Sequence, residues 1–325
     1  MISSQRELVK TKLNDIPDLP GIYKMLDSRR NIIYIGKSKC LKKRVKSYFV
    51  KSPKWEKVKK MVPFIYDIEY VTTDTHLEAM LLECELIKRV QPYFNVQMKN
   101  DSRYVYLHVG DEQISSPISI VHERGKDCYG PFRSKHVVEN MLAELKNVYP
   151  ITKNKSGYEF EYHVLPIQMT DIQIKENSEA IREMFKDIRK MDKFSLQLEK
   201  KMKQEAESFH FESAAKYRDI IRAIEYFKNG INRYKDLSMK HLLLKLKICK
   251  GYKLMYIVKG NVIYKQNYTS VTKKDQEKFM EQAKREYDNT KRIDHEKSNI
   301  DFLDILYSEI LTLPKDAIYV IDHDS

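Results

Sequence analysis

The residues of this chain best suited to chemistry are two tyrosines that stand close to a run of cations. Tyr23 ends the triplet GIY and Tyr34 begins the triplet YIG, and the second triplet leads into a segment rich in Lys and Arg, NIIYIGKSKCLKKRVKSYF. A short apolar strand that leads into a cationic segment is suited to holding an anion. One anion-binding site that contains both tyrosines and the basic segment would explain this pattern.

Glu83 is another residue whose type and position indicate a chemical role. On a helix its carboxylate would lie between apolar neighbours, because Ala79 stands four residues before it and Leu86 and Ile87 stand three and four residues after it. Such a carboxylate is partly buried and needs a cation or hydrogen bonds to offset its desolvation. A structural salt bridge would meet this need, and so would a hard metal ion such as Mg²⁺. Both alternatives are open.

A hairpin of two short strands, residues 21–26 and 32–35, is predicted to carry the tyrosines. With a tight turn between the strands, Tyr23 faces Tyr34 across the hairpin. Gly36 then frees the backbone for a sharp exit from the sheet. An aromatic strand residue is usually a core residue, so neither tyrosine indicates a site by itself.

A helix is predicted from the N-cap Ser38 through Tyr48. Its packing stripe consists of apolar residues three and four apart: Leu41, Val45 and Tyr48. The edge that lies close to Tyr34 carries Lys37, Arg44 and Tyr48. Cations on a short helix are usually solvated, and only their combination with the tyrosines indicates a site.

A second helix is predicted from the capping box Thr75-His76-Leu77-Glu78 to about Arg89. Its apolar stripe contains Leu77, Met80, Leu81 and Cys84. After this helix, the segment QPYFN brings the chain back and ends on the amide of Asn95.

The positive charge of the chain is concentrated at one end. The formal net charge is +13, and residues 1–60 contain 17 Lys or Arg against five Asp or Glu. A focused positive charge is typical of a surface that binds nucleic acid. An anionic membrane surface is the alternative. It is less favoured, because the cations alternate with strand and turn residues and do not lie along one long amphipathic helix.

Composition also limits the compartment and the cofactors. We expect no transmembrane segment, because the sequence has no run of about 18 apolar residues. The N-terminal residues MISSQRELVKTKL lack the apolar core of a signal peptide. Four scattered cysteines without a Cys-x-x-Cys pair fit a reducing cytoplasm and predict no zinc site: Cys40, Cys84, Cys128 and Cys249.

A close resemblance to the GIY-YIG nuclease domain of UvrC excision-repair nucleases covers about residues 15–104. It rests on LPGIYKMLDSRRNIIYIGKSKCLKKRVKSYF and, later, on EAMLLECELIKRVQPYFN. Either triplet alone would be weak, but here both stand at hairpin spacing. The other motif residues follow in the expected order: Arg44, Tyr48, Glu83 and Asn95.

The resemblance implies a role for each matching residue. Tyr34 corresponds to the catalytic tyrosine, Tyr23 to the tyrosine that supports it, and Glu83 to the sole protein ligand of a divalent metal, Mg²⁺ or Mn²⁺. Positions around the scissile phosphate correspond to Lys37, Arg44, Tyr48 and Asn95. The basic residues expected to bind DNA are Lys37, Lys42, Lys43 and Arg44.

The chemistry agrees with these roles. Phosphodiester hydrolysis needs an activated water, a cation for the developing charge, and help for the leaving oxygen. A tyrosine with a reference pKa near 10 is a poor base at neutral pH. We therefore expect Lys37, Arg44 and the metal to favour the phenolate form of Tyr34.

The middle of the chain resembles UvrC proteins less closely. Residues 128–132, CYGPF, are similar to the turn that follows the nuclease domain in that family, and a helix is predicted over 135–148. Many members carry four cysteines in this region, associated with an iron–sulfur cluster. This chain has NKSGY at residues 154–158, so we expect no cluster.

Residues 194–228 predict a pair of antiparallel helices. Two apolar stripes are expected: Leu198, Met202, Ala206 and Phe209 in the first helix, and Ala214, Tyr217, Ile221 and Ile224 in the second. An ordinary internal helix pair is one interpretation. However, FHFESAAKYRDIIRAI resembles the UVR motif, through which UvrC and UvrB associate. The partner-binding residues this implies are Phe211, Glu212, Ala215, Arg218 and Asp219. His210 is expected to be a loop residue without chemistry.

The remaining residues predict three strands, two helices and a last strand. This region faintly resembles the UvrC segment before the second, RNase H-like nuclease domain, and we expect it to be non-catalytic because Asp236 and Asp322 are poor candidates for its carboxylates. The predicted class is therefore α+β, with four parts: a GIY-YIG domain (1–104), a mixed connecting region (105–193), a UVR hairpin (194–230) and a small C-terminal α/β region (236–325).

The resemblance as a whole implies a short, Cho-type UvrC-like endonuclease of nucleotide excision repair and the SOS response. It would cut damaged double-stranded DNA 3′ of a lesion through one GIY-YIG site, recruited by UvrB and indirectly by UvrA, without a membrane partner. Two alternatives are open. One is a non-enzymatic adaptor that binds UvrB and DNA, and the other is a GIY-YIG nuclease that acts on branched or invading DNA independently of UvrA and UvrB.

Overall fold

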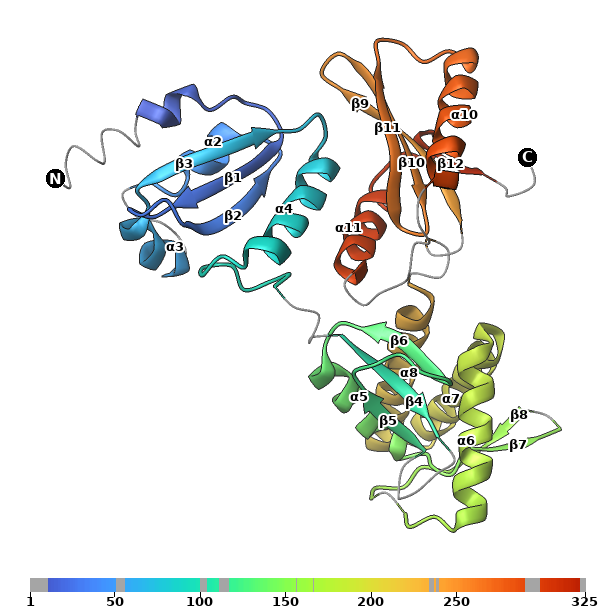
Figure 1. Cartoon of the computed structure of the whole chain (residues 1–325). Coiled ribbons are helices and arrows are strands. Elements are labelled where there is room, and N and C mark those ends of the chain that lie inside the picture. The colour runs from blue at the N-terminus through green and yellow to red at the C-terminus, as the bar shows by residue number, and fades with distance from the viewer. Residues whose placement is uncertain are drawn as a thin grey trace. The chain divides into compact units, whose positions relative to one another are not determined.

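The structure is a computed structural model that describes residues 11–50, 56–99, 104–110, 117–155, 157–165, 167–233, 237, 240–289 and 299–321. The described residues form two compact units (Figure 1). The first unit combines Met1–Asp101 with Asp236–Ser325, and the second spans Ser102–Lys235. Helices and antiparallel strands occur in both, which confirms the α+β class. No helix within these ranges is long and apolar enough to cross a membrane.

The first unit contains a three-stranded antiparallel sheet of order β2-β1-β3. Its strands are β1 (Gly21–Leu26), β2 (Ile32–Ser38) and β3 (Asp67–Thr72). The predicted hairpin is confirmed, but its predicted register is wrong. Tyr23 pairs with Gly36, and Tyr34 pairs with Met25.

The turn explains the different register. The carboxylate of Asp27 accepts hydrogen bonds from the backbone N–H of Arg29 and of Asn31, both at 2.8 Å, so Asn31 belongs to the turn. A bulge beside Leu26 then shifts the pairing of the strands by a further residue. Side-chain hydrogen bonds of this kind compete with the strand ladder and were not apparent from the apolar pattern.

Gly36 serves a different purpose from the expected sharp exit. It lies inside β2, and a Cβ atom at this position would stand 2.3 Å from the hydroxyl oxygen of Tyr23. The residue is therefore small because the ring of Tyr23 lies across the strand. Ser38 is likewise not the N-cap. Its hydroxyl bonds to the backbone of Cys40, and the next helix, α2 (Leu41–Lys46), begins after Cys40.

Two small cores lie on the two sides of this sheet. The packing stripe predicted for α2 is confirmed, because all three residues are buried on one side with Tyr23: Leu41, Val45 and Tyr48. The other side is covered by α4 (His76–Val90). Its capping box, Thr75 with Glu78, is confirmed. Within its predicted stripe, Leu77 and Cys84 are buried, whereas Met80 and Leu81 are only partly buried. A short helix, α3 (Glu56–Met61), and a 3₁₀ turn, η1 (Val62–Phe64), lead to β3.

The C-terminal part of the first unit is an antiparallel sheet of order β11-β10-β9-β12. Its strands are β9 (His241–Ile248), β10 (Gly251–Val258), β11 (Asn261–Tyr268) and β12 (Ile318–Ile321). Two helices accompany it: α10 (Lys273–Asn289) and α11 (Ile300–Ile310). The predicted series of strands and helices is confirmed here. The two aspartates considered as carboxylates, Asp236 and Asp322, lie outside the described residues.

The second unit joins a sheet of order β5-β4-β6 to four helices around one core. Its strands are β4 (Val105–Val109), β5 (Ile118–Val121), β6 (Cys128–Phe132), and the small pair β7 (Thr152–Asn154) and β8 (Gly157–Glu159). Its helices are α5 (Lys135–Lys146), α6 (Asp171–Lys186), α7 (Ile188–Glu207) and α8 (Phe211–Asn232). The turn predicted at residues 128–132 is therefore a strand, whereas the predicted helix after it is confirmed.

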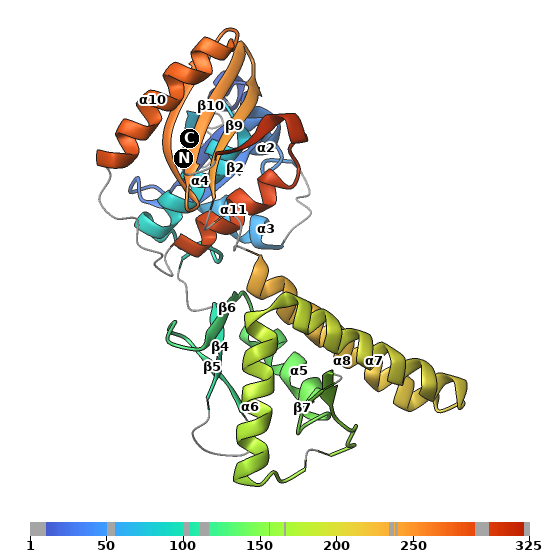
Figure 2. The ribbon, with the colours of Figure 1, turned by 90° about the vertical axis from the view of Figure 1, so that its right-hand side faces the viewer.

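The predicted helix pair is α7 and α8, which lie side by side in opposite directions (Figure 2). Both helices are longer than expected, and α7 begins at Ile188. The predicted stripe of α8 is buried in the core of the second unit. Phe209 does not continue the stripe of α7, because it lies in the turn with a positive φ of 64° and is 79% exposed.

Candidate functional site

Three tyrosines, two from strands and one from the turn after α2, meet on the α2 side of the sheet. The ring centroids of Tyr23, Tyr34 and Tyr48 lie 5.7–6.2 Å apart. The hydroxyls of Tyr23 and Tyr48 are 2.6 Å apart and hydrogen-bonded. Arg44 joins them, because its Nε atom donates to the Tyr23 hydroxyl at 3.3 Å and its guanidinium lies 5.0 Å from the centre of the Tyr48 ring. The structure thus brings four of the predicted site residues together.

Tyr34 is only partly buried, whereas Tyr23 is fully buried. Burial raises the pKa of Tyr34 well above its usual value, and the neighbouring Tyr48 and Glu83 raise it further. Arg44 lowers this pKa by less than the other groups raise it. Arg44 therefore favours phenolate, as expected, but burial outweighs it, and without a metal Tyr34 is a neutral phenol.

Lys37 reaches the site through its backbone. Its N–H donates to Oε1 of Glu83 at 3.0 Å. Its ammonium lies 3.1 Å from Nε2 of His76, the first residue of α4. Burial, followed by the charges of Lys37 and Lys39, lowers the pKa of His76 to about 4. The neutral imidazole can therefore accept the hydrogen bond from Lys37 at neutral pH.

His76 is a site neighbour that the sequence interpretation missed. The capping box identified its position at the start of α4, but the side-chain pair with Lys37 spans 39 residues of sequence. Only the packing of α4 across β2 makes this contact. No local pattern could have predicted it.

Glu83 lies on α4, close enough for its charge to act on Tyr34 and for that of Arg44 to act on it. Burial raises the pKa of its carboxyl to about 7, against the lowering effect of Lys37 and Arg44. Its Oε1 accepts from Lys37, whereas its Oε2 has no hydrogen-bond partner among the described residues. A half-buried carboxylate with one uncommitted oxygen suits a hard divalent cation.

A metal site at Glu83 would have few protein ligands. The described ranges contain no group of three or more His, Cys, Asp or Glu residues arranged to hold a metal ion. Magnesium binds in this manner, through one or two carboxylates with waters and substrate phosphate oxygens as the remaining ligands. Glu83 therefore fits a metal that is shared with a bound phosphate.

Asn95 is buried and holds the strand that carries Tyr34. Its Nδ2 donates to the carbonyl oxygen of Ile35, and its Oδ1 accepts from the N–H of the same residue, both at 2.9 Å. β2 is an edge strand, so these two bonds satisfy backbone groups that the sheet leaves unpaired. The amide fixes the backbone between Tyr34 and Gly36.

Lys42 and Lys43 lie on α2 away from its buried stripe. Lys43 is exposed and Lys42 partly so. Neither side chain enters the tyrosine cluster. They add positive charge next to the site, where Arg44 contacts Tyr23 and Tyr48.

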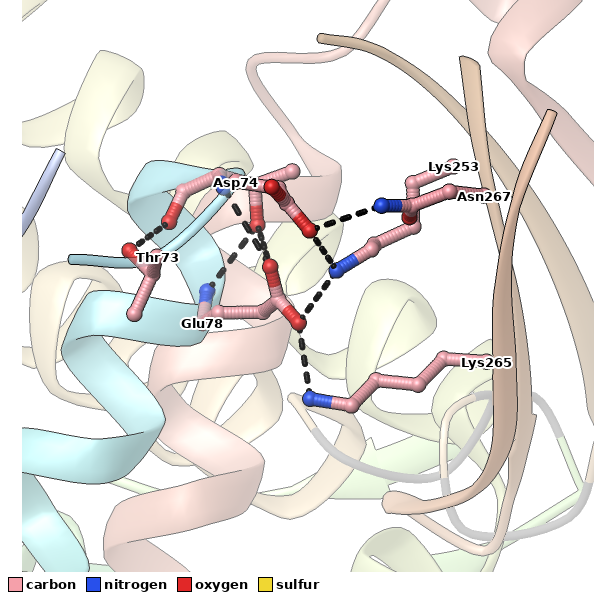
Figure 3. A network of polar contacts seen from close by, with 7 residues as sticks. Thr73, Asp74, Glu78, Lys253, Lys265 and Asn267 are labelled. Atoms are coloured by element: carbon pink, nitrogen blue, oxygen red, sulfur yellow. Dashed lines mark hydrogen bonds and ion pairs between the residues drawn. The ribbon is translucent and has the colours of Figure 1, made fainter. Parts of the chain in front are cut away.

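A second polar cluster lies at the N-terminal end of α4, outside the tyrosine site (Figure 3). The ammonium of Lys253 on β10 contacts Oδ2 of Asp74 at 2.6 Å and Oε1 of Glu78 at 2.7 Å. From β11, Lys265 contacts the same oxygen of Glu78 at 2.7 Å, and Asn267 contacts Asp74 at 3.0 Å. A cavity of about 1020 Å³ adjoins this cluster.

The tip of the helix pair presents two neighbouring aromatic rings. Phe209 is 79% exposed and Phe211 is 65% exposed, and their ring centroids lie 6.1 Å apart. The other predicted partner-binding residues share the outward side of α8: Glu212, Ala215, Arg218 and Asp219. Asp219 is paired with Arg218 and with Arg222, both at 3.2 Å. His210 lies in the turn, as expected.

Comparison with known proteins defines the class of the two segments. Residues 19–96 match the model of the UvrC-like GIY-YIG domain. Residues 196–227 match the model of the UvrB/uvrC motif. A GIY-YIG domain is thus combined with a UvrB/uvrC motif in one chain.

The similar full proteins are UvrABC system proteins C. The one from Rickettsia typhi is 34% identical over 241 residues, covering 69% of this chain and 38% of its own length. The one from Lactobacillus acidophilus is 36% identical over 230 residues, covering 67% and 38%. The chain therefore spans about 38% of the length of these relatives. Over the matched part, it is similar to these UvrC proteins.

Among solved structures, the GIY-YIG N-terminal endonuclease domain of UvrC from Thermotoga maritima is similar in sequence. That domain is described as bound to its catalytic divalent cation, magnesium. It is 34% identical, and the match covers 28% of this chain and 98% of the domain, with a TM-score of 0.26.

Proposed function

We propose that this chain is a divalent-metal-dependent DNA endonuclease of nucleotide excision repair, of the single-site Cho type. It makes the incision 3′ of a lesion and is recruited by UvrB. The observation that carries the proposal is the convergence of Tyr34, Arg44 and Glu83 at one partly open place. This place provides a hydroxyl, a cation and a carboxylate with a free oxygen, which are the groups that phosphodiester hydrolysis requires.

The residues of the chain divide the work as follows. Arg44 neutralises charge on the scissile phosphate, and its bond to the buried Tyr23 fixes the guanidinium. The neutral hydroxyl of Tyr34 orients the attacking water. Glu83 holds Mg²⁺ or Mn²⁺ through its free oxygen. When bound, such an ion supplies positive charge for the phosphate and favours ionisation of nearby groups.

The positions of the remaining groups support roles in alignment. Tyr48 is hydrogen-bonded to Tyr23, and the guanidinium of Arg44 lies over its ring. Tyr48 therefore helps to orient the guanidinium. Asn95 fixes the backbone on either side of Ile35 and thereby the position of Tyr34. The backbone N–H of Lys37 orients the Glu83 carboxylate. Lys42 and Lys43 bind DNA phosphates beyond the site.

The proposed partner surface is the tip of the helix pair. Exposed aromatic rings are frequent anchors in protein interfaces, and Phe209 and Phe211 have no apolar cover in the described chain beyond each other. The predicted stripe of α8 and Leu198 of α7 are buried, so the exposed aromatic surface of the hairpin lies at its tip. We assign UvrB to this tip, with UvrA acting through UvrB. The absence of an iron–sulfur cluster stays a prediction.

A single incision assay tests the proposal. A duplex with one bulky lesion and a label on the damaged strand is incubated with the chain and Mg²⁺, with or without UvrA and UvrB. We expect one nick 3′ of the lesion that requires both proteins. No nick under any condition favours the adaptor, and nicking that needs a branch instead of a lesion favours the nuclease that acts independently of UvrB.

A further inference from the structure

The region after residue 240 has no role in the proposed reaction, although its side chains contact the helix that carries Glu83. Lys253 is the most informative of them. Its side chain is only 7% exposed, yet it carries a charge. A buried ammonium is retained only where anions and hydrogen bonds compensate its desolvation. Here both compensating carboxylates, Asp74 and Glu78, come from the GIY-YIG domain.

Glu78 connects this cluster to the backbone of α4. Its Oε2 accepts from the N–H of Thr75 at 3.2 Å and closes the capping box, while its Oε1 accepts from Lys253 and Lys265. Both oxygens of one buried carboxylate are thereby committed. The first turn of α4 is held by its own cap and by two lysines from the C-terminal sheet.

Further contacts join α11 to the same helix. Lys88, in the last turn of α4, forms an ion pair of 2.9 Å with the buried Asp301. At the first residue of α4, Nδ1 of His76 lies 3.9 Å from Oε2 of Glu309. His76 also accepts a hydrogen bond from the ammonium of Lys37. The C-terminal region therefore contacts α4 at both ends, and Glu83 lies between these contacts.

We propose that the C-terminal region is a brace for α4, with Lys253 as a positioning residue. It fixes the helix, and through it the Glu83 carboxylate and the Lys37 backbone. The catalytic consequence rests on the proposed function, whereas the brace itself does not. The working nuclease then consists of the GIY-YIG domain together with the C-terminal region that begins at residue 236.

Hydrogen–deuterium exchange on the full chain, without DNA or metal, tests the brace. Lys253→Met keeps the volume and removes the charge, and should speed exchange of the amides in the first turns of α4 at least tenfold. Lys253→Arg keeps the charge and should restore protection. Lys247→Met is the matched control, because Lys247 pairs with the neighbouring position of β10 but is exposed. Equal exchange in Lys253→Met and the wild type would overturn the brace.

Cleavage measurements test its consequence. Lys253→Met should raise the Mg²⁺ concentration at half-maximal cleavage several-fold, with DNA affinity changed less than twofold. Faster exchange with an unchanged Mg²⁺ requirement would overturn the positioning role. A wild-type chain that fails to cut DNA would contradict the proposed function, and the exchange result would still decide the brace.

A different observation points to a second binding place, next to Tyr34. A cavity of about 680 Å³ is lined by Ile33 of β2 and by three aromatic rings: Phe64, Tyr93 and Phe94. Tyr93 is 81% exposed and Phe64 is 57% exposed. Phe94 lies between them, 5.0 Å from Tyr93 and 6.0 Å from Phe64 between centroids, and like Tyr34 it packs against the core that contains Tyr23 and Tyr48. The aromatic patch and the tyrosine site thus adjoin the same core.

The charges around this patch favour an anionic occupant. Lys60 lines the cavity, and the ammonium of Lys57 lies 5.5 Å from the centre of the Tyr34 ring. Among the described residues, no carboxylate forms an ion pair with either lysine. Asp27 also lines the cavity, but its carboxylate is occupied by three hydrogen bonds within its own turn. Aromatic rings with adjacent lysines bind unpaired bases of a nucleic-acid strand.

The geometry points to a stacking subsite for an unpaired base beside the scissile phosphate, which deepens the proposed function and rests on it. The test uses a single-stranded oligonucleotide that contains 2-aminopurine, in EDTA, so that no cleavage is needed. The wild type should quench the fluorescence on binding. Tyr93→Ala should weaken binding by about five- to 100-fold, as expected for the loss of one base–aromatic stack.

Two variants make this result specific. Tyr93→Phe keeps the ring and should bind within twofold of the wild type. Tyr70→Ala removes an exposed tyrosine of β3 that does not line the cavity, and should also bind normally. Normal binding by Tyr93→Ala, or no quenching by the wild type, would overturn the subsite. Quenching without any cleavage in Mg²⁺ would instead contradict only the endonuclease proposal.

Discussion

At the residue scale, burial favours the neutral forms of the ionisable groups at the site. Burial raises the pKa of both Tyr34 and Glu83, and it lowers that of His76. Desolvation is the largest cause in all three cases. Groups perturbed in this way and gathered at one place are typical of catalytic sites.

Tyr34→Phe removes one hydroxyl and keeps the ring. Tyr34 is only partly buried, and the Tyr23–Tyr48 hydrogen bond does not depend on it, so thermal stability should change little. If its hydroxyl orients the attacking water, cleavage should fall by about 10²- to 10⁴-fold. Single-turnover rates on a nicking substrate measure this. A variant that melts normally and cuts at the wild-type rate would make Tyr34 a core aromatic only.

Glu83 predicts a pH dependence of stability in the absence of metal. Its pKa is about 7 in the folded chain and near the reference value of 4.5 when unfolded, so the folded state binds the proton more tightly. The contribution of this group to stability is therefore present below pH 4.5 and is lost as the pH rises through 7. Urea unfolding midpoints in EDTA should fall less between pH 5 and 8 in Glu83→Gln than in the wild type. If the urea midpoints of the wild type and of Glu83→Gln change equally with pH, Glu83 is not desolvated.

At the element scale, the site depends on the register of the hairpin, which places the ring of Tyr23, on β1, across Gly36 of β2. The sequence was sufficient for the two hairpin strands, for α4 and its capping box, and for the three buried residues in and just after α2, because each follows from local sequence patterns. The sequence did not predict the register in which β1 pairs with β2. The register depends on the hydrogen bonds of Asp27 within its turn and on a bulge, neither of which changes the apolar pattern.

Contacts between distant segments were also beyond local patterns. Lys253 and Asp74 are 179 residues apart, so nothing near either residue indicates the pair. The spacing of the strands and the helix predicted that Arg44 lies near Tyr34, whereas the inclusion of Glu83 in the same site was expected only through the family resemblance. The raised pKa of Tyr34 was not predicted, because the sequence shows nearby cations but not the depth of burial.

Gly36→Ala tests the register directly. The added Cβ would stand 2.3 Å from the Tyr23 hydroxyl oxygen, so the ring or β2 must move. Overpacking of this kind costs about 1–3 kcal/mol of folding free energy. Gly125→Ala is the control, since its Cβ would meet only the sulfur of Cys128 at an ordinary 3.8 Å. Chemical denaturation compares the two. Equal stabilities would contradict the pairing of Tyr23 with Gly36.

At the scale of the whole molecule, the proposed chemistry and the proposed recruitment lie in different units. The tyrosine site belongs to the first unit and the helix pair to the second. Each unit has its own core. Variants at the helix tip should therefore separate recruitment from chemistry.

Phe211→Ala should weaken the capture of UvrB by this chain. The ring is 65% exposed, so its removal should leave the helix content and the melting temperature nearly unchanged. Truncation of an interface anchor costs about 2 kcal/mol or more of binding free energy. Leu196→Ala is the matched control, an equally exposed apolar residue of α7 away from the turn. Unchanged capture by Phe211→Ala, with circular dichroism like that of the wild type, would remove the tip from the interface.

The proposed function places DNA cleavage at one metal-dependent site, centred on Glu83. The most direct measurement compares wild type and Glu83→Gln for strand scission of a lesion-bearing duplex with UvrA, UvrB and Mg²⁺. The wild type should make one nick 3′ of the lesion, stop in EDTA, and recover with Mg²⁺ or Mn²⁺. Glu83→Gln should bind the DNA within a few-fold of the wild type and leave it uncut. Cleavage by Glu83→Gln at the wild-type rate, or wild-type cleavage that continues in EDTA, would contradict the account.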